Sequence, residues 1–320
     1  MNGGNGSSLL ITGATGFVGS RLHEAAVREN IWVRRALRRR NGIDGVVVGD
    51  LGPCNDWSDA LEGVEVVVHL AARVHIAADA AVDPMAEFRR VNVDGTVNLA
   101  KQAALAGSRR LVFVSSIKVN GEGTGLGKPF TTADAPGPRG PYAVSKFEAE
   151  QALRRVGQET GLEVVIIRPP LVYGPGVKAN FLRLITAVHK GVPLPFGRVR
   201  NKRSLVAVDN LVDLIMTCID HPAAAGRTFL VSDGEDLSTP GLIRKLARAM
   251  GRPARLLPVP TALLRLGGRA VGKMAEVERL IGSLQVDAGH TRKMLGWRPP
   301  VSVDEALRQT ARDFVSRVQA

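Results

Sequence analysis

The sequence has few aromatic residues, two cysteines and no long apolar run, and each shortage excludes a class of protein. Aromatic residues are 4% of the 320-residue chain, which leaves little for stacking against nucleic-acid bases. Cys54 and Cys218 lie far apart without metal or redox spacing, which indicates a reducing, cytoplasmic setting. No apolar run approaches the roughly 18 residues of a transmembrane helix. The opening MNGGNGSS lacks a basic stretch followed by an apolar one, so we expect no signal peptide.

The chain carries a strong positive charge, +13 by formal count. An anionic small molecule, a membrane surface or nucleic acid would each suit such a charge. No nucleic-acid motif accompanies it, so we expect no nucleic-acid partner. The arginines are spread along the chain except for a cluster at residues 34–40. The six histidines show no metal-ligand spacing, so we predict no metal site and expect His69 to be a core strand residue.

One stretch, Leu9–Gly19, organises the N-terminal half of the sequence. Its apolar run is followed by glycines at positions 13, 16 and 19, and then by a helical pattern. A buried strand that enters a helix through a glycine-rich turn presents backbone N–H groups at a helix N-terminus, which suits a pyrophosphate. The spacing is G-x-x-G-x-x-G, and its place after the first strand favours a phosphate-binding turn over an ordinary turn.

The rest of the first half alternates short apolar strands with helical patterns. This rhythm predicts an α/β fold, a doubly wound parallel sheet of the Rossmann type covered on both faces. The rhythm changes after Pro170. We therefore expect a dinucleotide-binding domain at residues 1–170 and a smaller C-terminal α/β substrate domain at 171–320, parts of which pack back on the first. A helical stretch at 262–284 is predicted to split near Gly267 and Gly268.

Three residues form a candidate catalytic set. Tyr142 and Lys146 stand four residues apart in a helical pattern, so they share one helix face. A nearby ammonium stabilises tyrosinate, which suits proton transfer during hydride transfer. Ser116 ends a predicted strand aimed at the same place, where it can hydrogen-bond a substrate oxygen.

The motifs together resemble the extended short-chain dehydrogenases/reductases, within them the nucleotide-sugar epimerases, dehydratases and 4-ketoreductases. The matching stretches run in the family's order: TGATGFVG (12–19), GDL (49–51), HLAA (69–72), VNVDGT (91–96), FVSS (113–116), YAVSK (142–146), RPPLVYGPG (168–176) and LGW (295–297). The resemblance implies that Tyr142 is the catalytic acid/base, that Lys146 also holds the nicotinamide ribose, and that Ser116 is the third catalytic residue. Further implied cofactor-binding residues are Gly13, Thr15, Gly16, Phe17, Val18, Asp50, Leu51, Leu70, Ala71, Ala72, Asn92 and Pro169.

The choice of dinucleotide depends on the end of the second strand. NAD enzymes place an acidic residue there for the ribose 2′-hydroxyl, but this chain has Leu37 followed by Arg38 and Arg39. The guanidinium groups favour the 2′-phosphate of NADP, with NAD as the alternative. The alternative interpretation is a surface turn at which the two arginines are simply solvated and bind no phosphate. Asn92 likewise has packing as its alternative role.

The substrate side follows from the same resemblance. Asn180 and Arg203 correspond to the family's ligands of the nucleotide diphosphate, and Arg279 is the candidate for a further arginine. After Ser116 the chain has Ile117 and Lys118, whereas the dehydratase branch has an Asp-Glu pair, which argues against dehydration. The family habit also implies a homodimer.

These observations lead to one main functional prediction and several alternatives. The main prediction is a cytoplasmic, NADPH-dependent 4-ketoreductase of a UDP-4-keto-6-deoxy-hexosamine used for surface polysaccharide. The first alternative is a UDP-hexose 4-epimerase that retains NAD. A non-catalytic NADP(H) sensor is disfavoured because Ser116, Tyr142 and Lys146 are all present. The last alternative is an enzyme that reduces a lipid-linked sugar or a steroid, because the basic and apolar residues at 263–280 could contact a membrane. An amphipathic helix pair explains these residues more simply, so we expect no membrane partner.

Overall fold

The computed structural model describes residues 7–40, 42–74 and 83–319, so the first six residues of the leader lie outside it. Within these ranges, seven parallel strands form one sheet in the order β3-β2-β1-β4-β5-β6-β9. Their bounds are β1 Leu9–Thr12, β2 Val33–Leu37, β3 Val46–Val47, β4 Val66–His69, β5 Arg110–Val114, β6 Glu163–Arg168 and β9 Thr228–Leu230. This is the predicted doubly wound fold, which the structure confirms.

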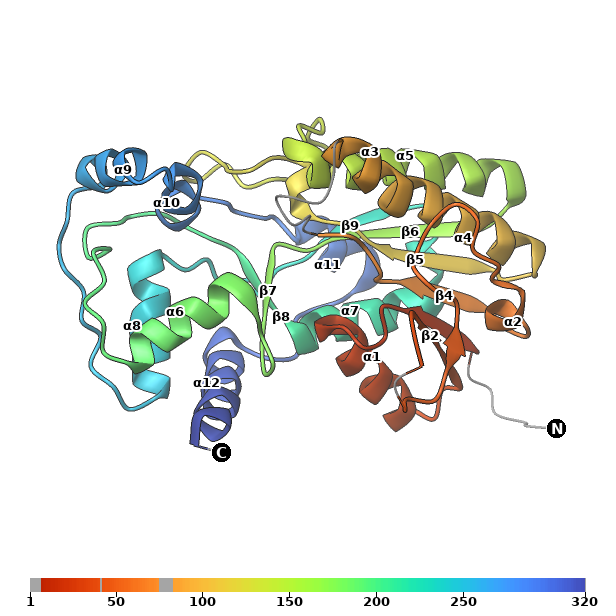
Figure 1. Cartoon of the computed structure of the whole chain (residues 1–320), viewed down its shortest axis with the longest axis horizontal. Coiled ribbons are helices and arrows are strands. Elements are labelled where there is room, and N and C mark those ends of the chain that lie inside the picture. The colour runs from red at the N-terminus through yellow and green to blue at the C-terminus, as the bar shows by residue number, and fades with distance from the viewer. Residues whose placement is uncertain (1–6, 41, 75–82, 320) are drawn as a thin grey trace.

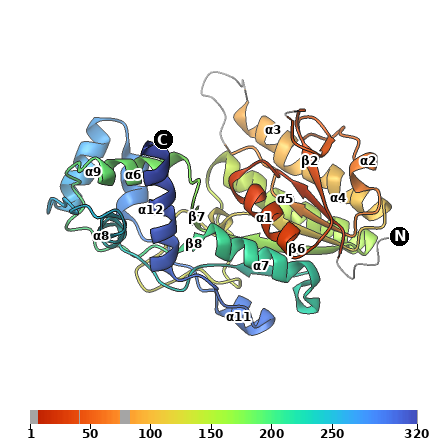
Figure 2. The ribbon, with the colours of Figure 1, turned by 90° about the horizontal axis from the view of Figure 1, so that it is seen from below.

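Helices cover both faces of the sheet, as Figure 1 shows, and each face has its own apolar core. One face is covered by α1 (Phe17–Arg28) and α7 (Val208–Asp220), which lie side by side in Figure 2. The other face is covered by α2 (Ser58–Leu61), α4 (Gly95–Leu105) and α5 (Gly140–Thr160). The central strands β1 and β4 are buried along their whole length, which explains their continuous apolar character, whereas β2 and β3 at the edge of the sheet are more exposed.

The segment 84–105, whose sequence is typical of one long helix, is interrupted in the structure. The segment consists of α3 (Pro84–Arg89), a π-helical turn at Arg90–Asp94 and then α4. The Asp83 side chain caps α3 by accepting hydrogen bonds from the backbone N–H groups of Met85 and Ala86. A π-helical turn changes which side chains face inward, and here it buries Asn92.

Much of the chain after residue 170 forms a second group of elements, at the left of Figure 1. A small sheet pairs β7 (Leu171–Tyr173) with β8 (Leu205–Ala207), two strands that the sequence analysis did not predict. The helices here are α6 Ala179–His189, α8 Thr239–Ala249, α9 Thr261–Ala270, α10 Met274–Ile281 and α12 Val303–Gln319. They share a third apolar core. The division at residue 170 stays a proposal, and the chain crosses it again when α7 and β9 return to the large sheet.

One further expectation about this half was wrong. The break between α9 and α10 lies at 271–273, because Gly267 and Gly268 are inside α9. A Cβ on Gly268 would lie 2.8 Å from the Val277 side chain, so this glycine permits close packing of the two helices. The helix α11 (Gly289–Leu295) was also not predicted.

Within the described ranges, no helix combines the length and the apolar character that crossing a bilayer requires. The same ranges contain no group of three or more His, Cys, Asp or Glu side chains arranged to hold a metal ion.

Candidate active site

The glycine-rich turn between β1 and α1 has the geometry of a phosphate-binding turn. Gly13 has a φ of 67°, and a Cβ there would lie 3.0 Å from the backbone nitrogen of Ala71. The N–H of Gly16, the N-cap of α1, donates to the Gly13 carbonyl at 2.9 Å. A Cβ on Gly19 would lie 2.1 Å from that same oxygen, so only glycine fits. Thr15 and Gly16 are exposed, which leaves the start of α1 open to an anion.

The predicted cofactor residues of β1 and β4 meet at one edge of the sheet. The strand order changes direction between these neighbours, and ligands of doubly wound folds bind in the crevice beyond such a point. The Thr12 hydroxyl accepts hydrogen bonds from the N–H groups of Leu70 and Ala71, both at 3.1 Å. Leu70, Ala71 and Ala72 are half-buried next to the turn, so the structure brings these predicted residues together with Gly13.

His69 links this edge to the helix behind it. Its Nδ1 lies 2.7 Å from the Thr12 hydroxyl, and its Nε2 lies 2.8 Å from the Thr96 hydroxyl. Because the Thr12 oxygen already accepts two N–H groups, its own proton points to Nδ1, which assigns the Nε2–H tautomer. Burial, helped by the charge of Lys146, lowers the pKa of His69 to about 3. His69 is thus a neutral core residue in a hydrogen-bond chain.

Ser116 and Tyr142 lie together at the carboxyl end of β5. Ser116 caps the short 3-10 helix Ile117–Val119, its Oγ accepting from the N–H of Lys118 at 3.3 Å. Burial raises the pKa of Tyr142 to about 12, and a hydrogen bond with Ser116 opposes that rise. The ring of Phe88 meets the Tyr142 ring edge-on at a centroid distance of 6.3 Å. The phenol is therefore held in a defined position and is neutral at physiological pH.

Lys146 lies one turn further along α5 and is almost completely buried. Its Nζ donates to the Val114 carbonyl at 2.8 Å and lies 4.1 Å from the ring centroid of Phe113. Burial lowers the pKa of Lys146 to about 7, while the carboxylate of Glu150 acts in the opposite direction. The predicted catalytic residues Ser116, Tyr142 and Lys146 thus gather at one strand end, as their spacing indicated.

A buried carboxylate that was not predicted from the sequence, that of Glu150, lies behind these residues. Glu150 accepts hydrogen bonds from Ser115 Oγ at 2.6 Å and from the guanidinium group of Arg168. Arg168 also donates to Asn120 Oδ1 at 2.9 Å. Glu150 stands four residues after Lys146, so the same i, i+4 rule that paired Tyr142 with Lys146 would have placed it on this helix face.

The residues predicted to select the dinucleotide lie close to another predicted cofactor-binding residue, Asp50. Arg38 follows β2, and its Nε lies 3.6 Å from Asp50 Oδ1, with both side chains largely exposed. Arg39 is exposed as well, and the described part of the chain offers it no ion pair. Leu51 is half-buried beside Asp50. These guanidinium groups are available to a phosphate next to the end of β2.

Two other predicted cofactor residues have protein partners. Asn92 is buried, and its Nδ2 donates to Ser145 Oγ and to the Arg73 carbonyl, each at 3.0 Å. Its Oδ1 accepts from the Arg73 N–H at 2.8 Å. The Pro169 carbonyl accepts from the N–H of Ile117 at 3.0 Å. Asn92 therefore ties the segment after β4 to α5, which agrees with a packing role. The predicted contacts of Asn92 and Pro169 with the cofactor stay predictions.

The predicted diphosphate residues come from separate segments of the second half. Asn180 is exposed in the first turn of α6. Arg203 is half-buried and donates from Nη1 to the Gly282 carbonyl at 3.0 Å. Burial lowers the pKa of Arg203, Glu122 raises it, and the charge of Arg279 lowers it further. Two guanidinium groups that repel one another are favourable for an anionic ligand, so the role of Arg203 stays a prediction with physical support.

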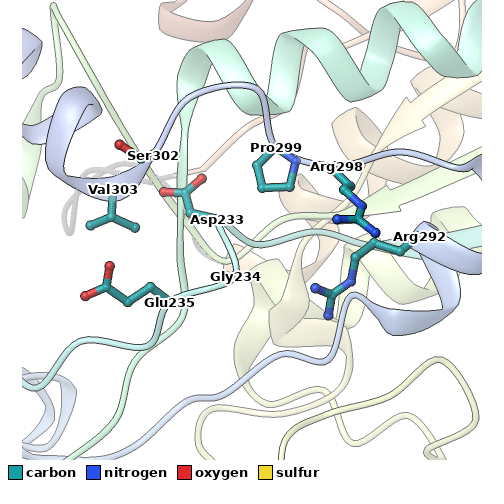
Figure 3. Close-up of a pocket in the computed structure, with 8 residues that line it drawn as sticks. All are labelled: Asp233, Gly234, Glu235, Arg292, Arg298, Pro299, Ser302 and Val303. Atoms are coloured by element: carbon teal, nitrogen blue, oxygen red, sulfur yellow. The ribbon is translucent and has the colours of Figure 1, made fainter.

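A pocket of about 590 Å³, drawn in Figure 3, lies at the carboxyl end of β9. Its wall consists of Asp233, Gly234, Glu235, Arg292, Arg298, Pro299, Ser302 and Val303. None of these is a predicted site residue. The Asp233 carboxylate beside it accepts from the Tyr173 hydroxyl at 2.8 Å and from Asn210 Nδ2 at 2.7 Å. We interpret this wall as the structural junction between β9 and the small sheet.

The strand order, the glycine turn at the switch point and the serine, tyrosine and lysine beyond β5 define an NAD(P)-dependent Rossmann-fold oxidoreductase. The chain belongs to the NAD dependent epimerase/dehydratase family, whose sequence model matches residues 9–232. The resemblance to extended short-chain dehydrogenases/reductases is therefore confirmed. So is the prediction of an enzyme of the nucleotide-sugar reductase or epimerase type that uses a nicotinamide dinucleotide.

Three similar proteins illustrate this family. A UDP-glucose 4-epimerase from Vibrio cholerae is 50% identical over 313 residues, covering 96% of this chain and 95% of the relative. The solved structure of MoeE5 in complex with UDP-glucuronic acid and NAD is 25% identical with a TM-score of 0.76, covering 98% of this chain and 100% of that chain. RMD from Pseudomonas aeruginosa, complexed with NADPH, is 24% identical with a TM-score of 0.72, covering 97% and 100%, and supports the fold alone.

Proposed function

We propose that the protein is a nucleotide-sugar 4-epimerase that acts on a UDP-hexose and retains NAD. The 50% identity to a UDP-glucose 4-epimerase over nearly the whole chain carries this proposal. The Ser116, Tyr142 and Lys146 arrangement is consistent with it, because epimerisation needs a proton acceptor and donor at one hydroxyl. The alternative of the sequence analysis thus replaces the 4-ketoreductase as the main function.

The chain's own residues would manage the proton at the reacting oxygen. Tyr142 Oη takes the proton from the sugar 4-hydroxyl and later returns it. Its pKa of about 12 must fall for this. We propose that the ammonium form of Lys146, which lies one helical turn away on the same face, lowers it when substrate and dinucleotide are bound. Ser116 hydrogen-bonds the reacting oxygen and Tyr142. The bound nicotinamide supplies the acceptance and return of hydride.

We propose the remaining contacts on the same basis. The turn at residues 13–18, the end of β4 and the pair Lys146 and Tyr142 would hold the dinucleotide. Asn180 and Arg203 would hold the UDP diphosphate, since a guanidinium group pairs well with phosphate oxygens. The enzyme would work as a homodimer in the cytoplasm, a location that fits its free thiols, Cys54 exposed and Cys218 buried.

One observation favours a second candidate, the NADPH-dependent 4-ketoreductase. Arg38 and Arg39 stand where an NAD enzyme would place a carboxylate, and they suit a 2′-phosphate. A reductase consumes a reduced dinucleotide at every turnover, and NADPH is the usual reducing form. The two functions therefore differ in whether the dinucleotide leaves between turnovers.

The experiment separates the two functions directly. The purified protein is incubated with UDP-glucose, UDP-N-acetylglucosamine or a UDP-4-keto-6-deoxy-hexosamine, each with and without NADPH. The expected result is a 4-epimer, detected by NMR, without net loss of NADPH. Stoichiometric NADPH oxidation with only the 4-keto sugar would establish the reductase instead. No turnover with any of them would overturn both proposals.

A further inference from the structure

The helices α9 and α10 form a hairpin at the end of the molecule furthest from the large sheet, as Figures 1 and 2 agree. They pack on one another through Gly268 and Val277, and Leu264 faces the third apolar core. An amphipathic helix pair requires one apolar side that packs on the protein, and this side of the hairpin is that packed side.

The opposite side of α9 is apolar but uncovered. Leu263 and Leu266 are 55% and 62% exposed, and their i, i+3 spacing places them on one helix face. Gly267 and Ala270 are exposed on the same face, and Val271 at the helix end is 66% exposed. A helix that both packs and exposes leucines has two apolar faces, and only one of them is accounted for by the fold.

Basic residues flank this uncovered face. The side chains of Arg269 and Lys273 are exposed, and no ion pair neutralises them within the described part of the chain. Arg265 pairs with Glu278 of α10 at 2.7 Å, so the hairpin's carboxylates are partly occupied inside it. Exposed leucines beside unpaired cations are the pattern by which helices bind anionic lipid surfaces.

Against the expectation of no membrane partner, we propose that the α9–α10 hairpin docks the enzyme on the surface of an anionic phospholipid bilayer, without crossing it. Leu263 and Leu266 enter the boundary between headgroups and acyl chains, while Arg269 and Lys273 face the anionic headgroups. Contact is reversible, since two leucines and two cations provide only a weak anchor. Arg203 donates to the carbonyl of Gly282, the C-cap of α10, at 3.0 Å, so docking of the hairpin would bring the predicted diphosphate site near the membrane.

Co-sedimentation of the full chain with vesicles tests this proposal. Vesicles of phosphatidylcholine with phosphatidylglycerol are compared with vesicles of phosphatidylcholine alone, at low and high salt. We expect binding only to the anionic vesicles, weakened by salt. The double variant L263E/L266E should abolish binding, and R269E/K273E should weaken it by about tenfold or more. Leu105→Glu is the matched control, because Leu105 is also an exposed helical leucine, at 87%, and should leave binding unchanged.

Other results would overturn the proposal. They are no sedimentation with anionic vesicles, equal binding to neutral vesicles, or unchanged binding by L263E/L266E. The proposal would also be contradicted if light scattering showed that L263E/L266E dissociates a dimer, because a second copy of the chain would then cover the exposed face of α9. Melting temperature and turnover of a soluble UDP-hexose should be unchanged in L263E/L266E, which separates loss of docking from loss of folding and from failure of the proposed function.

Discussion

Arg168 and Glu150 form a buried bidentate ion pair that joins the end of β6 to the middle of α5. Arg168 Nε lies 2.9 Å from Glu150 Oε1, and Arg168 Nη2 lies 2.5 Å from Glu150 Oε2. The two side chains are 4% and 0% exposed. Ser115 and Asn120, on either side of Ser116, hydrogen-bond to the same pair. The pair therefore fixes the strand end that bears Ser116 against the helix that bears the other candidate catalytic residues.

Glu150→Gln should strongly destabilise the protein. The substitution leaves the Arg168 guanidinium buried without its counter-charge, and losing one partner of a buried pair costs about 3–5 kcal/mol. The measurement is the free energy of unfolding in urea at neutral pH. Glu148→Gln is the control. Glu148 lies on the same helix as Glu150 and pairs with Arg89 of α3 at 2.8 and 2.6 Å, but this ion pair is far more exposed. Its loss should stay below about 1 kcal/mol, and equal losses in the two variants would contradict the argument.

Tyr142→Phe should lower kcat by a factor of about 10² to 10⁴, because it removes the group that takes and returns the proton. Binding of NADH, followed by the fluorescence of its reduced nicotinamide, should persist. The control is Tyr173→Phe, the other tyrosine of the chain. Tyr173 donates to the buried Asp233, so its loss should reduce stability more than kcat. If Tyr142→Phe retained full activity, Tyr142 would have no catalytic role.

Replacing Arg38 and Arg39 together by Ala should weaken NADP(H) binding about tenfold or more, because charge-assisted hydrogen bonds to the 2′-phosphate are lost. NAD affinity should change little, since NAD lacks that phosphate. Isothermal titration with each dinucleotide gives the comparison, and Arg40→Ala serves as the neighbouring control. Equal effects on the two dinucleotides, or none, would mean that these exposed arginines only meet solvent.

The parts of the fold that were predictable from the sequence have local causes. The path from β1 through the glycine turn into α1 requires only an apolar run and glycines where φ is positive or a Cβ would clash, as at Gly13 and Gly19. The placing of Tyr142 and Lys146 on one face follows from helix periodicity alone. Strand order is then constrained by the right-handed crossover of parallel strands.

The parts that were not predictable depend on partners distant in sequence. β7 and β8 have three residues each, too few for a periodic pattern, and exist because they pair across 34 positions (171 to 205). β9 joins the large sheet through pairing with β6, which no local signal reveals. The π-helical turn at 90–94 interrupts a sequence that reads as a plain helix. The Arg168–Glu150 pair likewise required two tertiary neighbours to be known.

His69→Gln should change the pH dependence of stability. The folded protein holds His69 neutral with a pKa of about 3, whereas the unfolded chain binds a proton near pH 6.5. The unfolded state therefore binds more protons below pH 6.5, and the free energy of unfolding falls as the pH falls towards 3. Between pH 7.5 and pH 5.0 this one group accounts for about 2 kcal/mol of lost stability.

The test is urea denaturation of the wild type and of His69→Gln at these two pH values. Gln lacks the titration, so the variant's loss between pH 7.5 and 5.0 should be smaller by about 2 kcal/mol. The variant should also be less stable at pH 7.5, because the hydrogen bonds to Thr12 and Thr96 are not reproduced with the same geometry. Parallel pH dependence in the two proteins would show that His69 titrates equally in the folded and unfolded states, contrary to its burial between β1 and α4.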